Sequence, residues 1–287
     1  MPDPLAKARL FAQRQTLRLR AWHRWRGVDG GDPALIAPGT SIPFCCNLCG
    51  TANAGTLAAL SREALTCTHC GSNVRFRAMA FLVTKEVLGR PLPLPDVPVR
   101  KEIAGVGLSD ADAYARPLAL KFTYENTFYH MEPRLDIADL DAARVGRYDF
   151  VIASDVFEHV VPPVARAFAN ARRLLKPGGK FIFTVPFTLE RETLEHYPDL
   201  HDWSLAEHEG AWTLTNRTQD GREQTYTDLV FHGGPGSTLE MRLFSREALE
   251  REFSEAGFAR VRIAAEPYLP FGIHWPEPWS VPMVAYA

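Results

Sequence analysis

The sequence lacks several features that would assign the chain to a special class of protein. No run approaches the roughly 18 consecutive apolar residues of a membrane-spanning helix, and the segment MPDPLAKARLFAQRQTLRLR has no apolar core typical of a secretory signal. We therefore expect a cytoplasmic protein without a membrane span. Internal repeats and low-complexity tracts are also missing, and the composition, with 46% hydrophobic and 23% charged residues, is that of an ordinary globular protein.

Strong net charge is missing as well. The formal net charge of -2 argues against a surface built as a whole for nucleic acid, because phosphate contacts depend on Lys and Arg. The exception is the segment 1–27, which is strongly basic and also carries Trp22 and Trp25. This pattern predicts a basic arm over residues 1–40 that either covers apolar surface or contacts an anionic membrane or nucleic acid.

Cysteine is scarce, but its spacing is informative. Four of the five cysteines form two C-x2-C pairs, each followed by a glycine: Cys46, Cys49, Cys67 and Cys70. Thiolates at this spacing can fold back on one cation, so we expect a zinc ribbon at residues 41–90 with a closed, structural Zn²⁺ site. The alternatives are disulfides or free thiols, which the expected cytoplasmic location disfavours. Cys45 could replace Cys46 if the register slips by one residue.

The remainder of the chain has the pattern of a doubly wound α/β domain. Four prolines within residues 89–101 predict a linker, and the segment 99–287 then alternates apolar strands with helical segments. Ser245 is the expected N-cap of the helix REALEREFSEA, and Pro162 and Pro163 are expected to begin a helix that runs to Leu175. The predicted strands are 99–104, 127–130, 148–154, 180–185, 259–264 and 281–286.

Residues 187–243 interrupt this alternation. The segment contains four of the nine histidines, and Asp220-Gly221 lies between two strand-like runs and predicts a hairpin turn. An insertion of this length is unusual for a mere connection, so we interpret it as a substrate-binding lid. Its HGGPGS loop, residues 232–237, is either a tight turn or an anion-binding loop.

Two short stretches carry the candidate chemistry. VRKEIAGVGLSD runs from an apolar strand into Gly105 and Gly107, where the backbone could approach a nucleotide closely, although Ser109 replaces the third glycine of the usual pattern. SDVFEHV places Asp155, Glu158 and His159 directly after a buried strand. Three ionisable side chains at that position predict a functional crevice.

Together, CTHCGSNVRFRA, YDFVIASDVFEHV, LLKPGGKFIFTVP and LFSREALEREFSEAGF resemble the class I S-adenosylmethionine-dependent methyltransferases, in particular bacterial members with an N-terminal zinc ribbon. The resemblance implies a Rossmann-like, seven-stranded α/β core that binds S-adenosylmethionine. It implies cofactor contacts in the following places: Gly105 and Gly107 at the amino acid part, Glu132 at the ribose, Asp136 at the adenine amino group, and Ser154 and Asp155 next to the methyl donor.

Methylation of a hydroxyl requires an aligned acceptor and removal of its proton, and His is the usual base. His159 is therefore a general base, a structural residue or a ligand of an additional divalent metal ion. The last alternative follows because Asp155, Glu158 and His159 form D-x-x-E-H, which is similar to the E-x-x-E-H of metal-dependent O-methyltransferases. His196, His201 and His232 of the insertion are expected to complete such a site.

We therefore expect O-methylation of a small-molecule or saccharide-like acceptor. The alternatives are an RNA-modifying methyltransferase that docks RNA through its ribbon and basic arm, and a non-catalytic module that binds the cofactor or a partner. The sequence does not specify the oligomeric state.

Overall fold

The computed structural model describes residues 32–287, so most of the expected basic arm lies outside the described residues. The chain forms two compact units. Unit 1 comprises the described residues up to Lys101 together with Ala111–Phe122 and Ala265–Pro276. Unit 2 comprises Glu102–Asp110, Thr123–Ala264 and Glu277–Ala287. Within the described part of the chain, no helix is long and apolar enough to cross a membrane.

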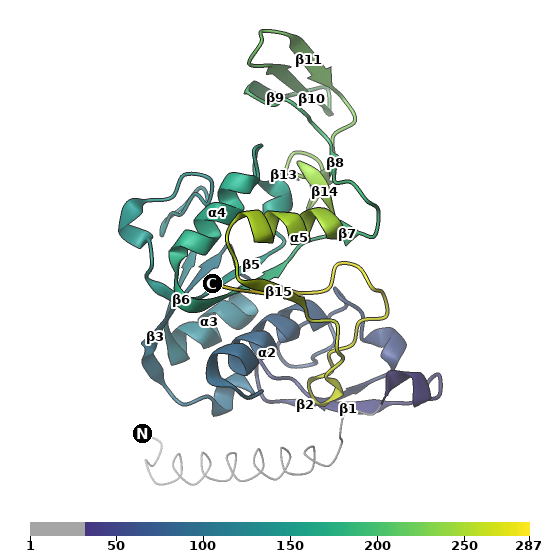
Figure 1. The fold of residues 1–287 in the computed structure, drawn as a ribbon. Coiled ribbons are helices and arrows are strands. Elements are labelled where there is room, and N and C mark those ends of the chain that lie inside the picture. Colours follow the sequence, from purple (N-terminus) through teal and green to yellow (C-terminus); the bar gives the residue numbers. More distant parts are fainter. Residues whose placement is uncertain (1–31) are drawn as a thin grey trace, which may run out of the picture. The chain divides into compact units, whose positions relative to one another are not determined.

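Unit 1 combines a cysteine-bearing hairpin with helices from separate parts of the sequence (Figure 1). The hairpin pairs β1 (Ile42–Cys45) with β2 (Ala52–Gly55), and the helices are α2 (Val74–Leu88) and α3 (Asp112–Lys121). Short 3-10 turns complete the unit: η1 (Pro33–Leu35), η2 (Leu57–Ala59), η3 (Leu94–Asp96) and η6 (Leu269–Phe271).

Helix α2 is the centre of unit 1. The side chain of Asn73 accepts a hydrogen bond from the backbone N–H of Phe76 and caps the helix, and Gly89 ends it in the left-handed conformation. Nine residues of the helix are buried, and Phe81 stacks on Tyr268 with 4.7 Å between ring centroids. Residues 265–276 therefore supply core to a unit that begins more than 200 residues earlier in the sequence.

One expectation for this region was wrong. The proline-rich segment 89–101 is not a linker, because Leu92, Leu94 and Val97 are buried and the N–H of Leu94 donates to the carbonyl of Asn47 at 2.7 Å. Helix α3 contains Pro117.

Unit 2 is built around a six-stranded sheet with the order β15-β16-β6-β5-β3-β4, whereas seven strands were expected. Strand β5 pairs in parallel with β3 and β6, and β16 pairs antiparallel with β6 and β15. The strands are β3 (Arg100–Leu108), β4 (Phe122–Thr127), β5 (Tyr148–Ser154), β6 (Leu175–Thr184), β15 (Arg260–Ile263) and β16 (Met283–Tyr286).

Helices α4 (Ala165–Leu174) and α5 (Arg246–Glu255) cover one face of this sheet (Figure 1). An aromatic cluster fills the interface: Phe168 lies 4.9 Å from Phe157 and 5.1 Å from Phe253, between ring centroids. Ser245 caps α5 as predicted, accepting from the N–H of Ala248 at 3.0 Å. Burial of these rings anchors the turn that follows β5, because Phe157 belongs to that turn.

The insertion between β6 and α5 consists of short strands. The predicted hairpin at Asp220-Gly221 is confirmed by the antiparallel pair β10 and β11. Tyr197, Leu200, Leu214, Leu239 and Met241 form a small core of the insertion. The strands are β7 (Phe187–Thr188), β8 (Leu194–Glu195), β9 (Asp202–His208), β10 (Ala211–Arg217), β11 (Glu223–Tyr226), β12 (Phe231–His232), β13 (Thr238–Leu239) and β14 (Arg242–Ser245).

Candidate active site and metal centre

The four cysteines of the C-x2-C pairs converge in unit 1. The Sγ atoms of Cys46 and Cys70 are 3.6 Å apart, as are those of Cys49 and Cys67, and all four lie within 4.8 Å of one another. Zn–S bonds of about 2.3 Å in a tetrahedron place the sulfurs roughly 3.8 Å apart, so the donor set fits a zinc ion. Cys45 lies outside this set of four, which resolves the register in favour of Cys46.

Polar groups surround the sulfurs. The Ser72 hydroxyl lies 3.2 Å from Sγ of Cys46, and the Asn53 amide donates to Sγ of Cys67 at 3.5 Å. The hydrogen bond with Cys46 lowers the pKa of Cys49, so this thiol favours the anionic form that metals bind.

Arg77 is a fully buried cation beside the cysteine cluster. Its guanidinium donates to the carbonyls of Ser72 and Gly272 at 3.0 and 2.8 Å and to the Thr66 hydroxyl at 2.9 Å. Burial lowers the pKa of Arg77, and the negative charge of the four thiols opposes that shift. The sequence did not single out this residue, although an arginine four residues after Asn73, within an apolar helix, was a usable signal.

In unit 2, the sheet reverses its strand order between β3 and β5. The chain continues from β3 to the neighbour β4 on one side and from β5 to β6 on the other. In open α/β sheets, ligands bind at this switch point, beyond the carboxyl ends of the strands. Leu108 pairs with Ala153, so Ser109 and Ser154 are the next residues at that edge.

Two residues at this edge have a left-handed backbone conformation, which strains Ser109 in particular. Ser109 has φ 55° and Asp155 has φ 56°, a region that disfavours side chains other than those of Asn and Asp. The N–H of Ser109 donates to Thr127 O at 2.7 Å, and that of Asp155 to Thr184 O at 2.8 Å. Such outliers concentrate at functional sites. Ser109 occupies the position of the missing third glycine.

The two glycines were expected in a loop, but strand β3 continues to Leu108 and contains both. A Cβ on Gly105 would lie 2.2 Å from the Phe150 ring, and one on Gly107 would lie 2.0 Å from the Tyr124 hydroxyl and 2.2 Å from the Asp110 carboxylate. Tyr124 donates a hydrogen bond to that carboxylate. The glycines therefore make room for side chains that support the edge of the sheet.

The predicted ribose and adenine acids follow β4. Glu132 is exposed and accepts from the N–H of Arg134, while Asp136 is half-buried and accepts from the N–H of Ala138 at 2.9 Å. Neither belongs to the strand itself. Asn126, which sequence reasoning missed, lies within β4 and exchanges two hydrogen bonds with the backbone of Asp110, at 2.9 and 2.8 Å.

The turn after β5 meets the insertion. His159 and His232 approach with 3.1 Å between Nε2 and Nδ1, and Oε1 of Glu158 lies 3.7 Å from the first nitrogen and 3.9 Å from the second. The side chain of Glu158 is fully buried, that of His159 is 16% exposed and that of His232 is 38% exposed. Burial lowers the pKa of His159 below its ordinary value. The structure therefore places His232, one of the three expected histidines of the insertion, beside His159.

Further residues of the insertion hold this cluster. Glu240 binds both His232 and His196, the latter with 3.0 Å between Nε2 and Oε1. The N–H of Met241 donates to the Glu158 carbonyl at 2.7 Å, and Arg242 donates to the carbonyls at both ends of the turn. Glu240 and Arg242 were missed, because a glutamate and an arginine near β14 carry no recognisable motif.

His201 is not part of this cluster. It is exposed, and its N–H donates to the Asn216 side chain at 2.9 Å in the β9–β11 sheet. The HGGPGS loop is a tight turn that joins β12 to β13, closed by the Ser237 hydroxyl bonding to the His232 carbonyl.

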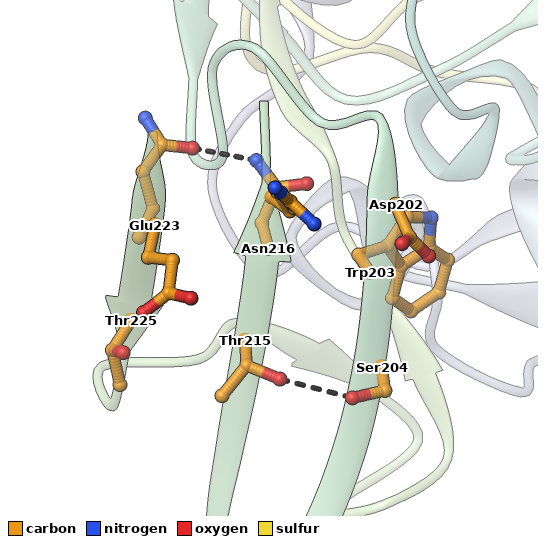
Figure 2. Close-up of a pocket in the computed structure, with 9 residues that line it drawn as sticks. Asp202, Trp203, Ser204, Thr215, Asn216, Glu223 and Thr225 are labelled. Atoms are coloured by element: carbon orange, nitrogen blue, oxygen red, sulfur yellow. Dashed lines mark hydrogen bonds between the residues drawn. The ribbon is translucent and has the colours of Figure 1, made fainter. Parts of the chain in front are cut away.

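A polar pocket of about 370 Å³ lies on the β9–β11 sheet (Figure 2). Arg217 pairs across the strands with Asp202 on one side and Glu223 on the other, and Ser204 hydrogen-bonds to Thr215 at 2.9 Å. Trp203 also lines the pocket. Hydroxyl, amide and charged groups with one aromatic ring are suited to a polar, hydroxylated ligand.

Comparisons with known proteins give one family match. A family model described as a methyltransferase domain matches residues 92–263. No curated protein matches the chain.

Solved structures similar to the chain include an S-adenosylmethionine-dependent methyltransferase from Clostridium acetobutylicum (13% identity, TM-score 0.42, covering 75% of this chain and 91% of that one). An amino pentose methyltransferase from Micromonospora echinaspora has 16% identity and a TM-score of 0.42, with 75% and 92% covered. The 1,6-didemethyltoxoflavin-N1-methyltransferase of Burkholderia thailandensis has 14% identity and a TM-score of 0.40, with 74% and 77% covered.

Proposed function

Because this chain belongs to the methyltransferase domain family and is an S-adenosylmethionine-dependent enzyme, we propose that it methylates an oxygen atom of a small-molecule or saccharide-like acceptor. The observation that carries this proposal is the meeting of His159 and His232 with Glu158 and Glu240 beyond the carboxyl end of β5. A hydroxyl must lose its proton when its oxygen is methylated, and this cluster provides nitrogen and carboxylate acceptors for it.

The cofactor is proposed to bind at the switch point of the sheet. Ser109, Ser154 and Asp155 would hold it there, with Gly105 and Gly107 behind them and Asp136 or Glu132 toward the nucleoside. S-adenosylmethionine supplies an electrophilic methyl group when bound. The protein side chains must then orient the acceptor hydroxyl, exclude water and take up the hydroxyl proton, as the C–O bond forms and the S–C bond breaks.

The acceptor class rests on the character of the insertion. Its pocket is lined by hydroxyl and amide groups and by Trp203. An aromatic ring beside hydrogen-bonding groups suits the faces and hydroxyls of a sugar. Arg217, between Asp202 and Glu223, could bond to ligand hydroxyl oxygens. His201 lies at the edge of the same sheet and belongs to acceptor recognition in this proposal.

We assign a structural zinc ion to Cys46, Cys49, Cys67 and Cys70. The sulfur separations support it, and four thiolates leave no open position for a substrate. Arg77 would offset part of the negative charge of four thiolates around one divalent ion.

The first test is the change Asp155→Asn with Asp199→Asn as its matched control, because both aspartates have positive φ, 56° and 62°, and asparagine tolerates that conformation. We expect isothermal titration with S-adenosylhomocysteine to give at least tenfold weaker binding for Asp155→Asn and unchanged binding for Asp199→Asn. Zinc content is measured on the same samples.

Wild-type protein that binds S-adenosylhomocysteine is then incubated with S-adenosylmethionine and a panel of monosaccharides and phenols, and product is identified by mass spectrometry. An O-methylated product supports the proposal. Equal binding by both variants would contradict the cofactor site, and exclusive N-methylation of amines would contradict the acceptor class. RNA that co-purifies and is methylated would instead favour the RNA-modifying alternative.

A further inference from the structure

The contact between His159 and His232 has an unusual property: neither ring nitrogen in it carries a proton when both rings are neutral. Nδ1 of His159 lies 2.7 Å from the carbonyl of Leu239, which only accepts, so this nitrogen is the protonated one. Nε2 of His159 then presents a lone pair.

The same reasoning applies to His232. Its Nε2 bonds to the carboxylate of Glu240, which also only accepts when ionised, so the proton of this ring is on Nε2. Its Nδ1 lone pair therefore faces the Nε2 lone pair of His159 at 3.1 Å. Two lone pairs at this distance repel each other unless a positive charge lies between or beside them.

A third donor points at the same place. Oε1 of the fully buried Glu158 lies 3.7 and 3.9 Å from the two lone-pair nitrogens. Donor atoms about 2.1 Å from an ion at angles of 90° to 120° are roughly 3.0 to 3.6 Å apart, so displacements of a few tenths of an ångström would bring all three into coordination. Buried carboxylates are characteristically paired or bound to metals.

We propose that Glu158, His159 and His232 bind a divalent transition-metal ion. Two imidazoles and one carboxylate suit first-row transition ions, whereas Mg²⁺ prefers six oxygen ligands. The hydrogen bonds that the two rings donate to Leu239 and Glu240 fix the ring orientations, as partners of metal-bound histidines do. Three protein ligands leave positions open, and His232, the most exposed of the three, marks the open side.

The role of this ion in catalysis rests on the proposed O-methylation: it would bind the acceptor hydroxyl and lower its pKa, so that the oxygen attacks as an alkoxide and its proton passes to solvent. With the ion bound, the two ring nitrogens act as ligands in place of proton acceptors. Binding of the ion does not rest on that function. The cysteine site does not compete for a probe such as Mn²⁺, because thiolates prefer softer ions.

The experiment titrates Mn²⁺ into protein that holds one zinc ion per chain and no excess zinc, because zinc binds imidazole ligands more tightly than Mn²⁺ does. Cofactor and acceptor are absent, and free Mn²⁺ is followed by electron paramagnetic resonance. We expect one bound Mn²⁺ per chain, with pulsed spectra that show coupling to imidazole nitrogen. His232→Gln and Glu158→Gln should weaken binding at least tenfold. His196→Gln is the matched control, since His196 also binds Glu240 but is not a ligand, and its affinity should stay within about threefold.

The change His232→Gln keeps an amide donor for Glu240 at a partly exposed position, so it remains informative if Glu158→Gln fails to fold. Absence of Mn²⁺ binding, or binding that all the variants retain, would overturn the metal site and leave a proton shared between the two rings. That outcome is separable from failure of the proposed function, which would appear as loss of S-adenosylhomocysteine binding or as methylation of nitrogen alone.

Discussion

The close packing around Gly107 gives a quantitative prediction for Gly107→Ala. The added Cβ would lie 2.0 Å from the Tyr124 hydroxyl and 2.2 Å from the Asp110 carboxylate, whereas real Cβ contacts stay above 3.0 Å. Overpacking costs about 1–3 kcal/mol, and disturbing a buried hydrogen bond to a charged group costs about 1.5–3 kcal/mol. We expect the free energy of unfolding to fall by about 3–5 kcal/mol in urea denaturation followed by circular dichroism.

Gly146→Ala is the control, because Gly146 has φ +68° and nothing lies within 4 Å of an added Cβ. The added backbone strain should lower its free energy of unfolding by only about 1–2 kcal/mol. The double change Gly107→Ala with Tyr124→Phe removes one of the two clashing atoms. It should cost at least about 1 kcal/mol less than the sum of the single changes. Equal losses for Gly107→Ala and Gly146→Ala, or additivity in the double variant, would refute this account of the glycine.

Two further predictions concern unit 1. Arg77→Met should lower the free energy of unfolding by at least about 2 kcal/mol in urea, because the carbonyls of Ser72 and Gly272 lose a buried charged donor, and a stability equal to wild type would contradict this role. Burial lowers the pKa of His274, so the unfolded state binds more protons between that lowered pKa and about 6.5. The free energy of unfolding should therefore fall as the pH drops through this window. His274→Gln should reduce the difference in unfolding free energy between pH 7.5 and pH 5.5. A difference unchanged by the substitution would contradict this role of His274.

The sequence predicted the elements whose signals are local. Strand Tyr148–Ser154 was placed with its observed bounds, because six consecutive residues, Tyr148 to Ala153, are apolar except for one aspartate. The Ser245 cap and the Asp220-Gly221 turn were also placed correctly, since both depend on a few adjacent residues. The four zinc-ligand candidates converge as their spacing implied.

The errors arose where residues distant in the sequence determine the local structure. Strand β3 extends to Leu108 because β5 pairs with it and Phe150 fills the space beside Gly105, which local glycine propensity does not reveal. Prolines predicted a linker, but tertiary contacts bury Leu94. Glu240 could not be found, since only the fold brings it beside histidines 8 and 44 residues away in the sequence.

The composition of unit 1 from three separate chain segments has a consequence for how the protein is made on the ribosome. Its cysteine hairpin and α2 emerge early, but Phe271 and Tyr268, which pack on Phe81, emerge last. The early segments therefore cannot complete their core, and they leave apolar surface uncovered, until residue 276 has been synthesised. Early capture of the proposed zinc ion would hold the hairpin in shape during that interval, and in that case the availability of zinc during translation should influence the yield of folded protein.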